Sequence, residues 1–188
     1  RGVLLLVWSL LSINAAADAP RARPVIDSTF GFNTIVTDQH TRLRGVSLSW
    51  DGGDPYGSQP KVIPTSAQLH RLADTFGLNT IHVYLEGNAS QNPNPVGVNL
   101  ADADALVSAT REAGLYVILT IGCNGENGSI HSMDFARDFW SLYAPRYKDE
   151  THVIFEAHNE PALYTPSQWT VQDWNRQVEL YHHIRDRC

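Results

Sequence analysis

From Leu43 onward the sequence alternates between strand patterns and helix patterns, and this alternation restricts the fold more than any other feature. Short apolar runs typical of strands are separated by longer segments with apolar residues at helical spacing. The strand patterns cover Leu43 to Trp50, Gly77 to Gly87, Gly114 to Gly122 and Thr151 to Pro161, and the helix patterns begin at Pro64, Asn99, Ser132 and Thr170. Strictly alternating units predict a parallel sheet with helices packed outside it.

Two α/β architectures share this order of elements, an open doubly wound sheet and a closed barrel. No Gly-rich phosphate fingerprint follows the first strand pattern, so a dinucleotide-binding fold loses its main support. We therefore predict a (β/α)8 TIM barrel, preceded by a short β-hairpin whose strands flank the turn from Thr37 to Thr41. Such barrels typically need ~250 residues. This chain has 188 and supplies only the first four β/α units, a partial barrel.

The N-terminal residues have the order of a secretory signal. Arg1 precedes an apolar run from Val3 to Leu11, and small residues follow up to Ala17. We expect a signal peptide over residues 1–17, a Pro/Arg-rich linker over 18–31, and the barrel half over 32–188. The alternative for the first segment is a buried apolar helix. The prediction is a secreted, extracellular protein without a membrane span, because no second long apolar run follows.

Composition narrows the range of partners. The formal net charge is -6 and the pI is near 5.7, which argues against nucleic-acid binding through a broad basic surface. No residues have metal-ligand spacing, so neither a metal nor another cofactor is expected. The sequons at Asn88 and Asn127 fit secretion and are candidate N-glycan sites. Cys123 and Cys188 are not expected to pair with each other, because a helix of about 25 Å separates the two ends of the barrel at which they lie.

Side-chain alternation indicates which residues line the barrel. In the second and fourth strand patterns, one face is apolar and the other is polar. The polar faces should line the interior, with His82, Tyr84, His158 and Glu160 rising toward the C-terminal rim, where barrel enzymes carry out their chemistry. Pro161 helps to end the last strand there.

Several stretches resemble glycoside hydrolase family 5, of the cellulase type within clan A. They are "LRGVSLSW", "GLNTIHVYLEG", "TREAGLYVILTIG", "FWSLYAPRYKDETHVIFEAHNEP" and "HHIRDRC", in the order and spacing of the first half of such an enzyme. The resemblance implies a retaining hydrolase of β-linked polysaccharides such as glucans or mannans. It matches Glu160 to the acid/base and Asn159 to the residue that contacts the sugar 2-hydroxyl.

The chain also departs from the pattern of that family. The nucleophile of the family comes from the seventh strand, and no acidic residue here occupies the matching place. Where the family commonly has arginine on the second strand, this sequence has His82, and where it commonly has Asp and His on the third, it has Thr120 and Gly122. These differences bear on subfamily and substrate. His82 could take over as a donor.

Other candidate residues have a structural alternative. Trp50 and Tyr84, near strand ends, are candidate platforms for sugar stacking, and the alternative is core packing. His158 either contacts substrate or forms a hydrogen bond inside the barrel. Glu156 is expected to be an interior structural carboxylate and Trp140 a core residue. His40, His70 and His152 are expected to be ordinary surface or element-end residues.

Two other functions compete with the glycosidase. One is a non-catalytic carbohydrate-binding protein, and the other is an inactive truncated fragment. The chain begins with Arg1, has its only methionine at Met133 and stops after a helical pattern, as a piece of a longer reading frame would. On its own, such a half-barrel would expose its inner face and two strand edges, and it would aggregate or dimerise.

Overall fold

A computed structural model describes residues 21–29, 31–48, 63–85, 97–121, 132–159 and 170–188. Several features predicted from the sequence lie outside these ranges. They are the signal peptide, Trp50, Glu160, Cys123 and the two sequon residues Asn88 and Asn127. Cys188 lies within the described ranges, is exposed and forms no disulfide with another described residue.

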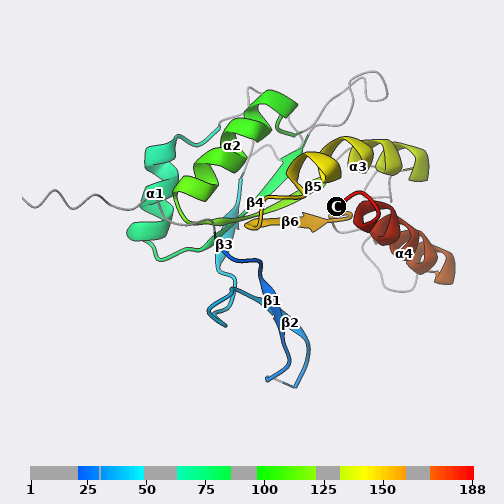
Figure 1. Ribbon diagram of the computed structural model, residues 1–188, viewed down its shortest axis with the longest axis horizontal. Coiled ribbons are helices and arrows are strands. Elements are labelled where there is room, and N and C mark those ends of the chain that lie inside the picture. Colours follow the sequence, from blue (N-terminus) through cyan, green and yellow to red (C-terminus); the bar gives the residue numbers. More distant parts are fainter. Residues whose placement is uncertain (1–20, 30, 49–62, 86–96, 122–131, 160–169) are drawn as a thin grey trace, which may run out of the picture.

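A four-stranded sheet forms the centre of the molecule. Its strands are β3 (Gly45–Ser47), β4 (Thr80–Leu85), β5 (Tyr116–Ile121) and β6 (Val153–Glu156), in the order β3-β4-β5-β6. All three neighbouring pairs are parallel. Figure 1 shows the helices α1 (Ser66–Asp74), α2 (Leu100–Glu112) and α3 (Met133–Tyr147) along one side of this sheet, with α4 (Val171–Arg185) at one end. The predicted partial barrel, with its helices outside the sheet, is confirmed.

The helices begin at residues that cap them. The hydroxyls of Thr65 and Thr170 each accept a hydrogen bond from the backbone N–H three residues later, and the side chains of Gln68 and Asp173 complete two capping boxes. The side chains of Asn99 and Ser132 cap α2 and α3 in the same way. The helix starts predicted from the sequence therefore agree with the structure to within a residue or two.

The core lies between the sheet and the helices. Ile81, Val83 and Leu85 on β4 are completely buried, as the alternation of the strand predicted. They join a single apolar cluster with side chains from α2, α3 and β5. Trp140 on α3 is also completely buried, which confirms its assignment to the core.

The N-terminal hairpin differs from the prediction. Its strands are β1 (Val25–Asp27) and β2 (Thr34–Val36), which pair antiparallel, so that β1 falls inside the stretch 18–31 expected to be a linker. The turn from Thr37 to Thr41 is present and is closed by backbone hydrogen bonds, with Thr37 N–H donating to the Thr41 carbonyl at 2.8 Å, but only an isolated bridge between Val36 and Arg42 follows it in place of a second paired strand. Three-residue strands with mostly exposed side chains carry too little alternation to be recognised from sequence.

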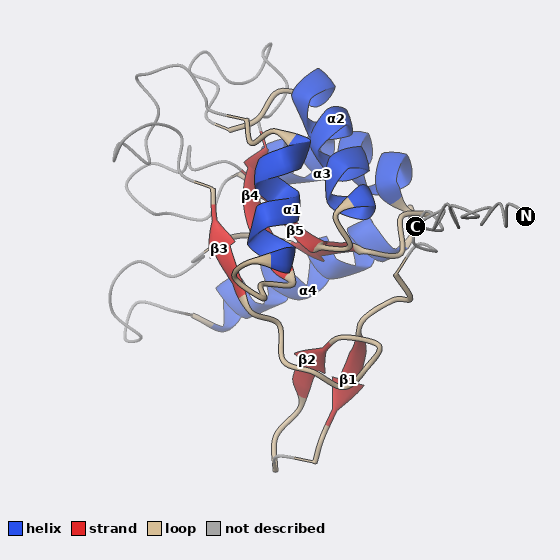
Figure 2. Ribbon diagram, turned by 90° about the vertical axis from the view of Figure 1, so that its left-hand side faces the viewer, coloured by secondary structure: helices blue, strands red, loops and turns tan. Residues whose placement is uncertain are grey.

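The segment before the hairpin contacts the sheet. The Tyr116 hydroxyl donates a hydrogen bond to the Ala22 carbonyl at 2.8 Å, and the Arg21 guanidinium lies 5.3 Å from the centre of the Tyr116 ring. Arg23 donates to the Lys148 carbonyl at 2.7 Å. Figure 2 shows the hairpin projecting away from the sheet and its helices. Residues 21–23 are therefore attached to the same structure as the sheet.

Gly45 gives a first prediction about stability. A Cβ atom at this position would lie 2.1 Å from the backbone oxygen of Thr80 on the neighbouring strand, which is too close for any side chain. We expect Gly45→Ala to push β3 away from β4 and to lower the free energy of unfolding by about 1–3 kcal/mol. Urea unfolding measures this. Arg44→Ala, at the adjacent exposed position, is the control, and an equal effect of both substitutions would contradict the steric explanation.

Candidate functional site

Strand β6 delivers the residues of the candidate site to the C-terminal edge of the sheet. The strand ends at Glu156, and Ala157, His158 and Asn159 follow as irregular backbone. The buried Trp140 indole donates a hydrogen bond to the Ala157 carbonyl at 3.1 Å, so α3 holds the backbone two residues before Asn159. Sequence reasoning assigned Trp140 to the core alone and missed this contact. Asn159 is half-buried, and its contact with a sugar stays a prediction.

A short polar contact on the inner face joins His82 on β4 to Glu156 on β6. His82 Nε2 lies 2.6 Å from Glu156 Oε2, and the pair spans the intervening strand β5. The two side chains are 20% and 37% exposed, so solvent reaches both. Glu156 was expected to be an interior carboxylate, but its pairing with His82 was not predicted. The signal available in the sequence was that both residues occupy the polar faces of their strands.

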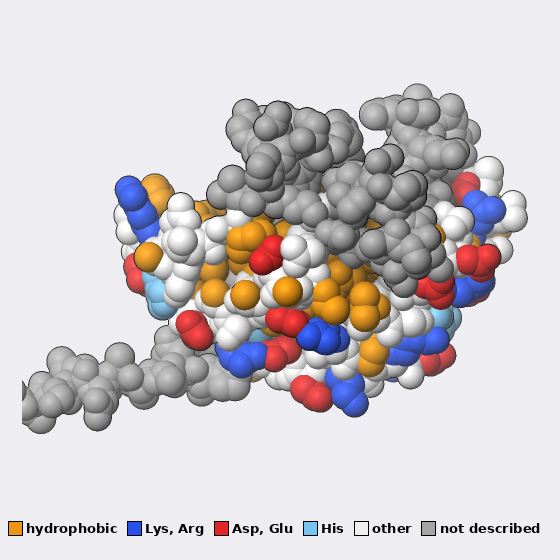
Figure 3. All heavy atoms as spheres, turned by 90° about the horizontal axis from the view of Figure 1, so that it is seen from above, with side chains coloured by type: hydrophobic (Ala, Val, Ile, Leu, Met, Phe, Trp, Pro, Cys, Tyr) orange, Lys and Arg blue, Asp and Glu red, His pale blue; other side chains and the backbone are white. Residues whose placement is uncertain are grey.

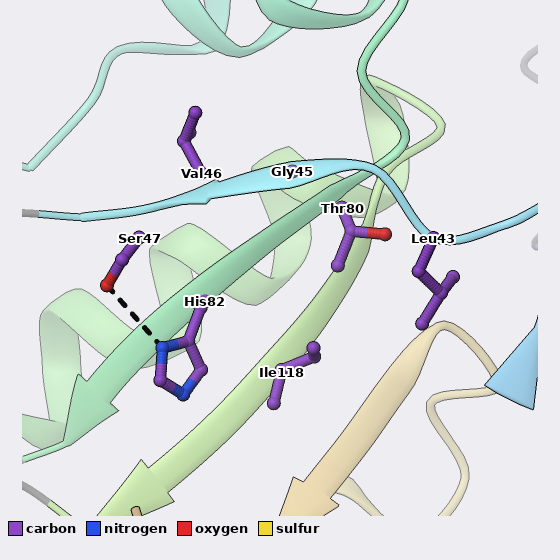
Figure 4. A pocket seen from close by; sticks show the side chains of 7 residues that line it. All are labelled: Leu43, Gly45, Val46, Ser47, Thr80, His82 and Ile118. Atoms are coloured by element: carbon purple, nitrogen blue, oxygen red, sulfur yellow. Dashed lines mark hydrogen bonds between the residues drawn. The ribbon is translucent and has the colours of Figure 1, made fainter. Parts of the chain in front are cut away.

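Two more side chains contact His82. Ser47 Oγ on β3 lies 3.4 Å from His82 Nδ1, within hydrogen-bonding distance, as Figure 4 shows. The Tyr84 ring meets the His82 ring edge-on, with centroids 4.8 Å apart. Tyr84 is half-buried and also packs against the apolar core, so the structure shows the packing alternative while sugar stacking stays a prediction. Three strands thus supply Ser47, His82, Tyr84 and Glu156 to one polar cluster.

His158 forms its hydrogen bond away from this cluster, toward α4. It was expected on the inner face with His82, but its Nδ1 lies 3.1 Å from the Gln177 side-chain nitrogen on α4. The alternation of the strand stops at Glu156, and the irregular backbone that follows turns His158 toward the helix. Burial lowers the pKa of His158, while the Gln177 contact opposes this effect. The predicted hydrogen bond inside the barrel is therefore replaced by one to α4, and contact with a substrate stays a prediction.

A shallow pocket of about 230 Å³ lies on the inner face beside the polar cluster. Figure 4 shows the Ser47, Thr80, His82 and Ile118 side chains on this face, with Val46 directed to the other side of β3. The pocket is lined by Leu43, Gly45, Val46, Ser47, Thr80, His82 and Ile118. This face can therefore offer an imidazole, a hydroxyl and a carboxylate to a polar ligand.

The described residues form neither a metal centre nor a membrane span. Within those ranges, no three His, Cys, Asp or Glu side chains are grouped so that they could hold a metal ion. No helix among the same residues has the length and apolar character needed to cross a bilayer. Figure 3 shows acidic and basic side chains intermixed on the face that it displays, with hydrophobic side chains between them.

His152 was expected to be an ordinary surface or element-end residue; it lies at an element end, but the structure shows that it is buried and not on the surface. It precedes β6, but its side chain is only 1% exposed, and its Nε2 lies 3.0 Å from the Val107 carbonyl oxygen on α2. The same nitrogen lies 3.3 Å from Thr110 Oγ1, also on α2, so the contacts that bury His152 come from a distant part of the sequence. Burial lowers the pKa of His152 below the ordinary value, an effect larger than the opposing contacts with Val107 and Glu150.

The lowered pKa values of His152 and His158 predict how stability depends on pH. In the unfolded chain both imidazoles take up protons near the ordinary pKa of 6.5, whereas in the folded chain they do so only at lower pH. The free energy of unfolding should therefore fall as the pH drops below 6.5, by about 1.4 kcal/mol for each pKa unit of difference. Urea unfolding between pH 8 and pH 5 measures the slope. His152→Gln should reduce this slope, because it removes one of the two buried imidazoles; the same slope in the variant and in the wild type would contradict the assignment.

The fold and the site together define a class of protein, a partial parallel β/α barrel with a polar cluster on its inner face. The family model for cellulase, glycosyl hydrolase family 5, matches residues 34–186. The chain therefore belongs to this family, and the resemblance noted in the sequence is confirmed. A comparison with curated protein sequences gave no match.

Solved structures show the same fold at low sequence identity. A Caldicellulosiruptor sp. F32 family 5 lichenase mutant in complex with cellotetraose is 19% identical, with a TM-score of 0.55 over 77% of this chain and 48% of its own. A Thermobifida fusca endoglucanase Cel5A mutant in complex with cellotetraose is 22% identical, with a TM-score of 0.54 over 82% of this chain and 48% of its own. Cellulase Cel5C_n is 20% identical, with a TM-score of 0.57 over 89% of this chain and 51% of its own. The chain spans about half the length of these structures.

Proposed function

We propose that this chain is the N-terminal half of the catalytic barrel of a secreted, retaining β-glycosidase. The observation that carries the proposal is the segment after β6, where Asn159 lies at the C-terminal edge of a parallel sheet and Glu160 follows directly in the sequence. An Asn-Glu-Pro sequence alone would be weak evidence for a glycosidase site. Membership of the family over residues 34–186 strengthens it.

The proposed chemistry assigns different tasks to the carboxyl groups. Glu160 protonates the leaving glycosidic oxygen and later, as a carboxylate, removes a proton from the attacking water. Asn159 holds the sugar 2-hydroxyl, a contact that strengthens in the oxocarbenium-like transition state. A nucleophilic carboxylate about 5–5.5 Å from Glu160 completes a retaining site, and the proposal places it in a C-terminal half that follows this chain.

The proposed substrate is a β-linked polysaccharide of the cellulose, glucan or mannan type. Two of the similar structures hold cellotetraose, a β-linked glucose oligomer. The cluster of Ser47, His82 and Glu156 provides hydrogen-bonding groups on the inner face. The resemblance to the family matches His82 to the position where an arginine is common. We therefore propose that His82 acts as a polar donor in the cleft.

Two linked experiments test this function. The first is to sequence the transcript beyond Cys188, and the second is to express the complete reading frame and assay it on cellulose, lichenan and mannan by release of reducing sugar. Four further β/α units with a strand-end glutamate, together with hydrolysis, would support the proposal. A stop codon directly after Cys188 would remove the nucleophile from the polypeptide. Sugar binding without hydrolysis would then favour a carbohydrate-binding protein, and neither property would favour an inactive fragment.

A further inference from the structure

The hydrogen bonds of His152 determine which nitrogen of its ring carries the hydrogen. Nε2 lies 3.0 Å from the Val107 carbonyl oxygen and 3.3 Å from Thr110 Oγ1, and the Thr110 hydroxyl donates its own hydrogen to the same carbonyl. A carbonyl can only accept, so Nε2 carries the hydrogen of the neutral ring and Nδ1 presents a lone pair. This Nδ1 atom is buried and forms no hydrogen bond with another described residue. The ring is therefore held in a form that can still take up one proton.

The Nδ1 atom faces a carboxylate that already has a partner. Glu150 Oε2 lies 3.6 Å from His152 Nδ1 and accepts a hydrogen bond from Arg111 Nε at 3.0 Å, while Arg111 also pairs with Glu150 Oε1. In the described part of the chain, the charged groups that act on His152 are Glu150, two residues before it, and Arg111 on α2, with opposite signs. A proton on Nδ1 would place a second cation beside one carboxylate, in a ring that is 1% exposed. Burial of an incompletely compensated charge is costly, so proton uptake favours opening of this contact.

The connection between α3 and β6 that carries Glu150 also holds the N-terminal segment. The Thr151 hydroxyl donates a hydrogen bond to the Arg21 carbonyl oxygen, and the Arg23 guanidinium donates to the Lys148 carbonyl at 2.7 Å. We call residues 21–23 the N-terminal strap. The strap is thus attached to the residues that immediately precede the buried imidazole, through contacts made entirely by described residues.

We propose that His152 and Glu150 form an acid-operated latch that releases the N-terminal strap. At neutral pH the uncharged imidazole lies between α2 and the start of β6, and the connection before it holds the strap. When the pH falls, Nδ1 takes up a proton, the connection separates from α2, and its contacts with the strap are lost. Release exposes the peptide bond between Arg21 and Ala22 to proteases that hydrolyse the chain after arginine. Removal of the segment before Ala22 therefore depends on pH.

Cleavage by trypsin after Arg21 reports this release directly. Trypsin takes the arginine side chain into its specificity pocket and attacks the carbonyl carbon of the same residue. In the docked strap, the Arg21 guanidinium lies 5.3 Å from the centre of the Tyr116 ring, and the Arg21 carbonyl accepts the hydrogen bond from Thr151. Both groups must leave these contacts before trypsin can act.

The experiment uses the complete polypeptide between pH 7.5 and pH 5.5. Mass spectrometry gives the rate of cleavage after Arg21, which is divided at each pH by the rate for a synthetic peptide of residues 18–27. This ratio removes the pH dependence of trypsin itself. It should rise severalfold, and at most about tenfold, as the pH falls, because one ionisation controls the release. Cleavage after Arg137, within α3, measures global unfolding and should stay slow.

Two matched variants assign the effect to His152. His152→Gln keeps a side-chain N–H that can donate to Val107 but takes up no proton, so its ratio should not change with pH. His158→Gln removes the other buried imidazole, which contacts α4 beyond the opposite end of β6, and should keep the wild-type pH dependence. If circular dichroism shows that His152→Gln is unfolded, Glu150→Gln replaces it. Without the carboxylate that attracts the proton, release should then occur at lower pH.

Four results would overturn the proposal. They are a wild-type ratio independent of pH, the same rise in His152→Gln, an unshifted rise in Glu150→Gln, and release that coincides with cleavage after Arg137. The readout does not depend on sugar binding or hydrolysis, so the latch can fail while the proposed function stands.

Discussion

Replacing Glu160 by glutamine in the complete polypeptide is expected to remove most of its turnover while leaving the fold and oligosaccharide binding intact. Glutamine has nearly the same shape as glutamate but can neither protonate a leaving group nor deprotonate water. General acid/base groups contribute about 10²–10⁴-fold to rates, so kcat on cellulose-type substrates, whose leaving groups are poor, should fall by that factor. Reducing-sugar assays give kcat, and calorimetry with cellotetraose gives the affinity.

The matched control for this prediction is Glu179→Gln. Glu179 is an exposed residue on α4 that pairs with Arg137, so the same chemical change occurs far from the proposed site. The role of Glu160 can also be tested with an aryl glycoside whose leaving group needs little protonation. With this glycoside, Glu160→Gln should slow the first step, loss of the leaving group, less than it does with a polysaccharide. Azide attacks without a general base, so adding it should restore turnover of the variant. Unchanged activity of Glu160→Gln on polysaccharide would remove Glu160 from the acid/base role.

Replacing Trp140 by alanine should lower the free energy of unfolding more than Gly45→Ala does. The indole is completely buried and contacts Phe139 and Phe155 edge-on, with ring centroids 5.0 and 5.4 Å apart. Removing a buried large aromatic ring typically costs about 3–5 kcal/mol. The Ala157 carbonyl would also lose its hydrogen-bond donor. Urea unfolding at fixed protein concentration gives the loss directly.

Trp140→Phe separates packing from the hydrogen bond. Phenylalanine keeps most of the apolar contact but has no N–H group, so we expect an intermediate loss of stability in this variant. In the complete enzyme, the same variant should affect kcat more than it affects overall folding, because the backbone at Ala157 leads directly to Asn159 and Glu160. Equal losses of stability in the two variants would show that ring packing contributes little. A wild-type kcat in Trp140→Phe would remove Trp140 from the positioning of Asn159.

The parts of the fold that follow periodic patterns were predictable from the sequence. The alternation along β4 correctly separated the buried Ile81 and Val83 from the inner-face His82, and the capping residues Thr65 and Thr170 correctly marked helix starts. These features are local, because neighbouring residues in the chain determine them. The β1–β2 hairpin was misplaced because its short exposed strands are stabilised by pairing rather than by a pattern of their own.

The candidate site was predictable only in part. Alternation placed His82 and Glu156 on the same face, but their contact depends on how far two side chains reach across β5, which sequence spacing does not give. His158 was misplaced because the regular strand ends at Glu156, before the predicted alternation reaches His158. His152 was misplaced because its burial depends on α2, a helix some forty residues earlier in the chain.

The contacts of residues 21–23 have a practical consequence for choosing an expression boundary. The family match begins at residue 34, and trimming the gene there would remove the backbone oxygens that accept hydrogen bonds from Tyr116 and Thr151. It would also remove the Arg23 contact with Lys148, and it would remove β1, the strand with which β2 pairs. A recombinant product should therefore start no later than Arg21. Affinity tags placed before that residue leave these anchoring contacts in place, whereas a domain cut at the edge of the family match would begin with an unsupported strand.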